Sequence, residues 1–181
     1  TDQTFDNAHA VAFANYNNDN DNYPDLALAT QDRIRLYRGS SEGLLYDDTW
    51  FQAVAPRGLC WINTGSDAYL DLVVADSAGQ NLLIVQTESG FSTQNVGTET
   101  EASVAVAAGD FDSQPGVDIL FINHGADDRL YTGPDYTSSE TISASANTSR
   151  SAALSDLDGE NGMDAVVVGS GGNSLYLNTV D

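Results

Sequence analysis

The stretch that decides the fold covers residues 156–168 and reads DLDGENGMDAVVV. Its first, third, fifth and ninth residues are acidic, the ninth being Asp164, and an apolar run follows at once. Three earlier segments have a similar layout and close at Asp25, Asp71 and Asp118, so that successive closing aspartates are 46, 47 and 46 residues apart. Such regular spacing predicts an array of four similar structural units.

Short apolar runs and turn residues surround each closing aspartate in the same order. The run directly after the aspartate is typical of a buried strand, and a second apolar pair comes 11 or 12 residues after the aspartate, beyond a turn. A strand of small residues precedes each loop. The runs are 26–29, 72–75, 119–122 and 165–168, the pairs are 36–37, 83–84, 130–131 and 175–176, and the preceding strands are 10–13, 59–62, 104–107 and 152–154. With no sustained helical period, the chain is predicted to be all-β.

Four units of about 46 residues predict a β-propeller of four blades that forms a single domain over residues 1–181. The fourth unit stops soon after Leu177, whereas Phe5 to Asn15 resembles the missing outer part in outline. We therefore expect the N-terminal strand to complete the last blade and close a ring, within one chain or by exchange between two chains that gives eight blades. Ragged terminal repeats are the alternative. Residues 137–151, although rich in Ser and Thr, are predicted to hold outer strands of the third blade.

Composition excludes several classes of function. The 181 residues include 27 acids, 21 of them aspartate, against 6 arginines and no lysine, and the net charge is −21. A nucleic-acid or anionic-membrane surface would require a basic patch, so neither partner is expected. The sequence contains no run of 18 apolar residues, so no membrane-spanning helix is expected. Cys60 is the single cysteine, which excludes an internal disulfide.

The loops before the closing aspartates have the donor chemistry of calcium sites. Ca²⁺ takes about 6–8 oxygen ligands, and a nine-residue loop offers side-chain oxygens at its first, third, fifth and ninth places and a carbonyl at its seventh. The expected ligands are Asn17, Asp19, Asp21, Asp25 and the carbonyl of Tyr23 in loop one (17–25), Asn63, Asp67, Asp71 and the carbonyl of Tyr69 in loop two (63–71), Asp110, Asp112, Gln114, Asp118 and the carbonyl of Gly116 in loop three (110–118), and Asp156, Asp158, Glu160, Asp164 and the carbonyl of Gly162 in loop four (156–164).

Several alternatives remain open for these loops. Loop one has a second register that starts at Asn15, because two extra residues precede its motif. Loop two carries Gly65 where a donor is expected, so its site is predicted to be the weakest or empty, giving three to four ions in all. The alternative to metal binding is that the aspartates only cap tight turns. An EF-hand is excluded, because the loops lead into strands and lack the terminal glutamate.

The joins between loop and strand resemble the DxDxDGxxDLxV pattern of the FG-GAP/VCBS repeat family, whose members form integrin-like β-propellers. The matching segments are 23–28, 70–74, 117–120 and 163–167, with 35–38 and 174–178 downstream. The departures are Gly65, Gln114, Pro115, and Asn22 or Asn161 where glycine is usual. The copy number also departs, since this chain has four units and integrin-like relatives usually have seven blades.

The resemblance implies a secreted or cell-surface, calcium-dependent module for recognition or adhesion, and it does not assign a single ligand. A structural subunit that assembles as a dimer or filament through exchanged terminal strands is one alternative. A carbohydrate-binding lectin is another, with Trp50, Trp61, Tyr46 and Tyr136 as candidate sugar contacts unless they pack between blades. Catalysis is not expected, because His9 and His124 belong to no recognised catalytic motif.

Two arginines stand out in so acidic a chain. Arg33 and Arg35 alternate along one predicted strand and therefore share a face. They are expected either to form ion pairs with neighbouring aspartates or to meet an acidic partner surface.

Overall fold

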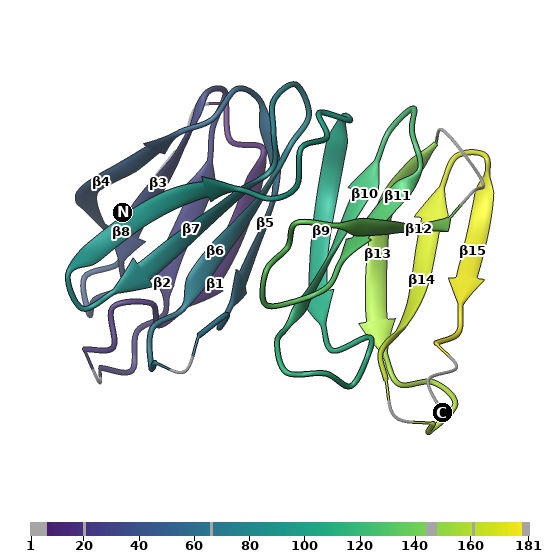
Figure 1. Cartoon of the computed structure of the whole chain (residues 1–181). Helices are drawn as coiled ribbons and strands as arrows, with labels where there is room; N and C mark the ends of the chain where they lie inside the picture. The colour runs from purple at the N-terminus through teal and green to yellow at the C-terminus, as the bar shows by residue number, and fades with distance from the viewer. Residues whose placement is uncertain (1–6, 20, 66, 144–147, 161, 179–181) are drawn as a thin grey trace.

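The computed structural model describes residues 7–19, 21–65, 67–143, 148–160 and 162–178 (Figure 1). Over these ranges the chain is all-β, as predicted, with fifteen strands and no helix. The described part of the chain accordingly has no helix of the length and apolar character needed to cross a membrane.

The strands form four antiparallel sheets, each built from consecutive strands. Sheet A contains β1 (Ala10–Ala14), β2 (Asp25–Ala29), β3 (Arg33–Arg38) and β4 (Leu45–Gln52). Sheet B contains β5 (Pro56–Ile62), β6 (Asp71–Asp76), β7 (Leu82–Thr87) and β8 (Gly90–Asn95). Sheet C contains β9 (Ser103–Gly109), β10 (Asp118–Asn123), β11 (Asp128–Tyr131) and β12 (Ser139–Ser143). Sheet D contains β13 (Ser149–Ser155), β14 (Asp164–Gly169) and β15 (Gly172–Tyr176).

The repeat predicted from the sequence is confirmed as four successive meanders. The small-residue strands are the first strands of the sheets, the apolar runs are the second strands, and the later apolar pairs lie in the third strands. Within residues 137–151, β12 forms the outer strand of sheet C as expected, and β13 begins sheet D. Of the segment Phe5 to Asn15 that was expected to complete the last blade, residues 5 and 6 lie outside the described ranges, and Ala10–Ala14 form β1 of sheet A, where they pair with β2.

The second strands owe their continuous apolar runs to burial on both faces. Every residue of β6 and β10 is buried, because a neighbouring sheet covers each side. Every residue of β2 is buried as well, but Leu26 and Leu28 lie in a small cluster with Tyr37 and Leu44 of the same repeat. In β14 the alternation returns, since Ala165 and Val167 are buried while Val168 is 40% exposed. Sheet D therefore has a neighbour on one face only.

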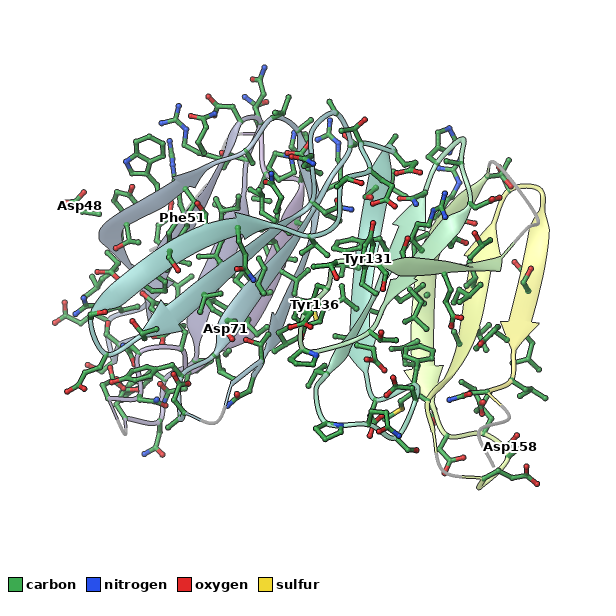
Figure 2. All side chains as sticks on the ribbon, viewed as in Figure 1. Asp48, Phe51, Asp71, Tyr131, Tyr136 and Asp158 are labelled. Atoms are coloured by element: carbon green, nitrogen blue, oxygen red, sulfur yellow. The ribbon has the colours of Figure 1, made fainter. Side chains whose placement is uncertain are left out.

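The sheets pack face to face in chain order, through contacts between β1 and β5, β5 and β9, and β9 and β13 (Figure 1). Between sheets A and B, Tyr16 stacks on Trp61 with ring centroids 5.3 Å apart. Between sheets B and C, Phe121 and Tyr131 meet edge to face at 5.8 Å, and Tyr136 packs in the same cluster (Figure 2). Burial of this apolar surface, at about 25 cal/mol per Å², is the main force that joins the sheets.

Buried polar residues connect sheets B and C at the end of the molecule away from the acidic loops. The Ser103 hydroxyl donates to Oδ1 of Asn123, at 2.7 Å, and accepts from Nδ2 of Asn81, at 2.9 Å. Asp76 of sheet B similarly accepts the backbone N–H groups of Val54 and Ala55. These two residues belong to the segment that connects sheet A to sheet B. No motif in the sequence marks these residues, because the paired positions are 20 or more residues apart.

Candidate metal centre

All four acidic loops lie at one end of the molecule. Each joins the first strand of its sheet to the second, so the antiparallel pairing places the four connections at the lower end in Figure 1. Asp71 of loop two and Asp158 of loop four mark this end in Figure 2. The repeat in the sequence therefore becomes a row of acidic turns.

Each closing aspartate is a buried acceptor for two separate parts of its sheet. In loop three, Oδ2 of Asp118 accepts the N–H of Phe111 at 2.6 Å, and Oδ1 accepts the N–H of Gly133 at 2.9 Å. The corresponding donors are Tyr16 and Gly39 for Asp25, Thr64 and Gln86 for Asp71, and Leu157 and Asn178 for Asp164. These carboxylates are at most 3% exposed. They connect the loop to the far end of the hairpin, a structural role that the sequence analysis missed although the junction with the strand marks it.

Loops three and four gather three carboxylates each. One oxygen from each of Asp110, Asp112 and Asp118 lies within 4.8 Å of the other two. Asp156, Asp158 and Asp164 form the same arrangement in loop four. The first two members of each group are accessible and the closing aspartate is buried, so an ion at either group would lie between solvent and the sheet.

The remaining predicted donors of these two loops are not part of the groups. Glu160 is exposed on loop four, and its N–H donates to Oδ1 of Asp158 at 3.0 Å. Gln114 likewise donates its N–H to Oδ1 of Asp112, at 2.8 Å. Gly116, the predicted carbonyl donor, has φ of 128°, and a Cβ there would lie 3.0 Å from the backbone of Gly133. In loop three, the backbone conformation and the close approach of Gly133 therefore favour glycine at the seventh place.

The tight bend of loops three and four falls at the fourth residue of each loop. Ser113 and Gly159 both have left-handed backbone, with φ of 57° and 80°. Oδ1 of the first aspartate accepts the N–H of this fourth residue, from Ser113 to Asp110 and from Gly159 to Asp156. This hydrogen bond stabilises a left-handed backbone conformation that residues other than glycine rarely adopt.

Loop one follows the register that begins at Asn15. The N–H of Tyr16 donates to Oδ2 of Asp25, which is the bond that the second residue of each other loop makes to its closing aspartate. Asn18, with φ of 53°, then corresponds to the left-handed fourth residue. The structure thus favours the alternative register, with two additional residues ahead of Asp25.

Side-chain oxygens of loop one that could bind a metal accept hydrogen bonds from the loop's own backbone. Oδ1 of Asn17 accepts the N–H of Asp19, and Oδ1 of Asp21 accepts the N–H of Tyr23. Oδ1 of Asn15 is buried, and the described residues give it no hydrogen-bond partner. Within the described ranges, the acids of this loop do not form a third group as close as those of loops three and four.

Loop two is the poorest in charge. Asn63 and Asp67 are exposed and bond to the loop itself, through Asn63 Nδ2 to the Asp67 carbonyl and the Tyr69 N–H to Asp67 Oδ1. The hydroxyl of Thr64 donates to Asp71, so one more acceptor site of that carboxylate is occupied. The weakness of loop two as a calcium site stays a prediction.

Burial and like charge raise the cost of ionising two of the closing aspartates, Asp118 and Asp25. Burial raises the pKa of Asp118 above its ordinary value of 3.8, and the nearby carboxylates of Asp112 and Asp110 raise it further, whereas hydrogen bonds from Gly133 and Phe111 oppose the shift. The pKa of Asp25 is raised for the same main reason, with Asp19 as the charged neighbour. A cation would relieve both repulsions.

We predict from this that calcium binding weakens as pH falls. Because the pKa of Asp118 is raised, its charge costs stability above that pKa in the metal-free chain, and protonation removes both the cost and a ligand. The difference in melting temperature between the chain with calcium and the chain stripped of metal should therefore shrink from about pH 7 to about pH 4.5. A difference that is constant over this window would contradict the prediction.

Neighbouring loops are connected to one another. The N–H of Met163 in loop four donates to the carbonyl of Asp110 in loop three, at 2.8 Å. Between these loops lies a hollow of about 350 Å³, lined in part by Asp110 and Asp156. Asn18 of loop one similarly donates to the carbonyl of Ala68 in loop two. A change in one loop is thus expected to affect the next.

The other candidate residues divide between core and surface. Trp61 and Tyr136 pack between sheets, with the Trp61 Nε1–H donating to the carbonyl of Ala12 and Tyr136 only 3% exposed. Trp50 and Tyr46 are 49% and 45% exposed on β4. Arg33 forms the expected ion pair with a neighbouring aspartate, Asp32, at 2.9 Å. Of the four aromatic candidates, two therefore remain accessible to a ligand.

Comparisons with known proteins identify no relative: no protein-family model matches the chain, and no curated protein matches it.

Proposed function

We propose that this chain is a calcium-stabilised β-propeller module of the FG-GAP/VCBS type that serves recognition or adhesion outside the cell. The observation that supports this proposal is the pair of carboxylate groups, Asp110, Asp112 and Asp118 and Asp156, Asp158 and Asp164, on equivalent loops of neighbouring sheets. Three carboxylates in one place repel one another unless a cation joins them. The repetition of the same arrangement is hard to explain by turn formation alone.

The donor sets fit Ca²⁺ better than softer metals. The gathered atoms are oxygens, and the loops add amide and backbone oxygens at nearby places, which hard cations prefer. Loops three and four are proposed as the two principal sites. Loop one, with fewer carboxylates at matching places, is a weaker site, and loop two is the weakest.

The propeller is the arrangement that best explains the stacking of the sheets. Four equivalent meanders pack in chain order, with their first strands adjacent, as the inner strands of blades are in a propeller. Sheet D has three strands where the others have four. We propose that an N-terminal strand, from the same chain or from a second copy, supplies the missing outer strand and closes the ring.

A recognition role is favoured over catalysis. His9 precedes β1 of sheet A and His124 follows β10 of sheet C, so the two histidines belong to different sheets. Trp50 and Tyr46 offer exposed rings on β4, and the guanidinium of Arg33 lies 5.1 Å from the centre of the Trp50 ring. Exposed aromatic rings of this kind suit a glycan or a protein ligand, and a lectin is the second candidate function.

Calorimetric titration of the metal-free chain with CaCl₂ tests the proposal. We expect two tight binding events, because two loops gather three carboxylates. Asp110→Asn should remove one event and Asp156→Asn the other, since each change removes one negative charge from its group. Asp48→Asn is the matched control, because Asp48 is exposed on β4 and its left-handed φ of 58° suits asparagine. Absence of calcium uptake by the unaltered chain would exclude the proposed function.

A further inference from the structure

Sheet D turns an uncharged, partly apolar face outward. The pairing of its strands places two rows on this face, Ser151, Val168 and Asn173 in one and Ala153, Val166 and Leu175 in the other. Val168 and Leu175 are 40% and 57% exposed. An uncharged sheet face is unexpected in a chain of net charge −21, and exposed apolar groups of this kind usually mark an interaction site.

Sheet A turns a second apolar face outward at the other end of the row. Its strand pairing gives the rows Val11, Leu28 and Arg35 and Phe13, Leu26 and Tyr37. Leu26, Leu28 and Tyr37 lie in a small buried cluster with Leu44, whereas the two residues of β1 are open. Val11 and Phe13 are 56% and 59% exposed. Arg35 is the single charged residue in the two rows. The residues on the opposite side of the sheet, such as Ala27 and Leu36, pack against sheet B.

Each outward face corresponds to a face that is buried elsewhere in the molecule. Val166 and Val168 lie two and four residues after their closing aspartate, and the residues at those places in sheet C, Leu120 and Ile122, are fully buried against sheet D. The residues of sheet B equivalent by pairing to Val11 and Phe13 are Leu59 and Trp61, which pack against sheet A. The outward faces of sheets A and D are thus the two halves of a fourth interface of the same kind.

The two halves do not meet within the chain. Figure 1 shows sheets A and D extending to opposite sides of the molecule, with sheets B and C between them. The complement of each face is therefore a second copy of the chain, which carries the other half in the orientation that the internal interfaces use. We propose that two copies dock end to end, the outward face of sheet A of each on the outward face of sheet D of the other, and so complete one ring of eight sheets.

This inference rests on the proposed propeller arrangement but not on its metal sites. The contact is head to tail, because it joins sheet A of one copy to sheet D of the other. A ring of two copies uses the outward faces of sheets A and D of both copies. Because each copy carries a net charge of −21, charge opposes association and apolar burial drives it. The dimer should therefore become more stable as salt screens the repulsion, whereas an interface held by ion pairs would weaken.

Light scattering after gel filtration of the 181-residue chain, in calcium and moderate salt, measures the mass directly. We expect twice the 19.2 kDa of one chain. Phe13→Asp and Leu175→Asp should each yield monomers, because each places a carboxylate in the interface. Leu45→Asp is the control: Leu45 is 55% exposed, but it adjoins Tyr46 in β4 and points to the opposite side of the strand.

Mixing the two monomeric variants gives the decisive result. The Phe13→Asp chain keeps an intact sheet D, and the Leu175→Asp chain keeps an intact sheet A, so the mixture should recover a dimer through one intact interface. Recovery also shows that both variants are folded. A wild-type chain that stays monomeric, an open series of higher masses, or no recovery in the mixture would overturn the proposal. Calcium uptake measured on the same samples separates this failure from failure of the proposed function.

Discussion

Removal of divalent cations is expected to lower the melting temperature of this protein by about 10–20 °C. Calcium at about 100 times its dissociation constant stabilises the folded state by about 2.7 kcal/mol per site, and loops three and four are the two principal sites that we propose. For a chain of this size, 1 kcal/mol corresponds to about 2–4 °C. The effect is large because the ligands converge only in the folded protein.

Thermal unfolding followed by circular dichroism, in excess calcium and in excess EDTA, provides the measurement. Asp158→Asn should lose roughly half of the difference, because it removes one carboxylate from the loop-four group. Asp48→Asn, which removes an equal charge at an exposed site outside the loops, should keep the full difference. Equal melting temperatures in calcium and EDTA would show that the acidic turns form without metal.

Asp118→Asn is expected to destabilise the protein by about 3–5 kcal/mol whether or not calcium is present. Asp118 is 1% exposed, and both of its oxygens accept backbone N–H groups, from Phe111 at 2.6 Å and from Gly133 at 2.9 Å. An asparagine must direct its NH₂ group at one of these donors. The change therefore leaves a buried N–H without an acceptor and adds a repulsive contact.

Asp112→Asn separates this structural role from metal binding. Asp112 belongs to the same carboxylate group but is only partly buried, and its Oδ1 accepts the N–H of Gln114, which an amide oxygen also does. Asp112→Asn should lower the stability of the protein in calcium and leave its stability in EDTA nearly unchanged. Urea denaturation in both conditions measures the two effects. If Asp118→Asn were also neutral in EDTA, the backbone bonds of the closing aspartate would not stabilise the sheet.

The closing aspartate thus combines two roles that the sequence analysis treated as one. As a proposed metal ligand it belongs to a loop motif, and this is visible in the spacing of acids. As a buried acceptor it connects residues up to 15 positions apart, such as Gly133 and Asp118. That second role depends on where the hairpin returns, so it appears only in the structure.

The sequence alone determined the repeated elements of the fold and the chemistry of the loops. Alternating or continuous apolar runs and turn residues act over a few neighbouring positions, so β2, β6, β10 and β14 and their hairpins could be predicted from adjacent residues. The acids in loops three and four stand at alternate places next to a strand, and in these two loops they come together as the spacing predicted.

Tertiary structure decided what depends on contacts between distant residues. It set the register of loop one at Asn15, because Asp25 accepts the N–H of Tyr16 across a two-residue insertion. It placed Trp61 in the interface between sheets A and B and joined Asn81 to Asn123 through Ser103. Among the described residues, it also left one face of each end sheet without a neighbouring sheet. These outcomes follow from the packing of whole sheets, where a residue's surroundings come from other repeats and local sequence does not specify them.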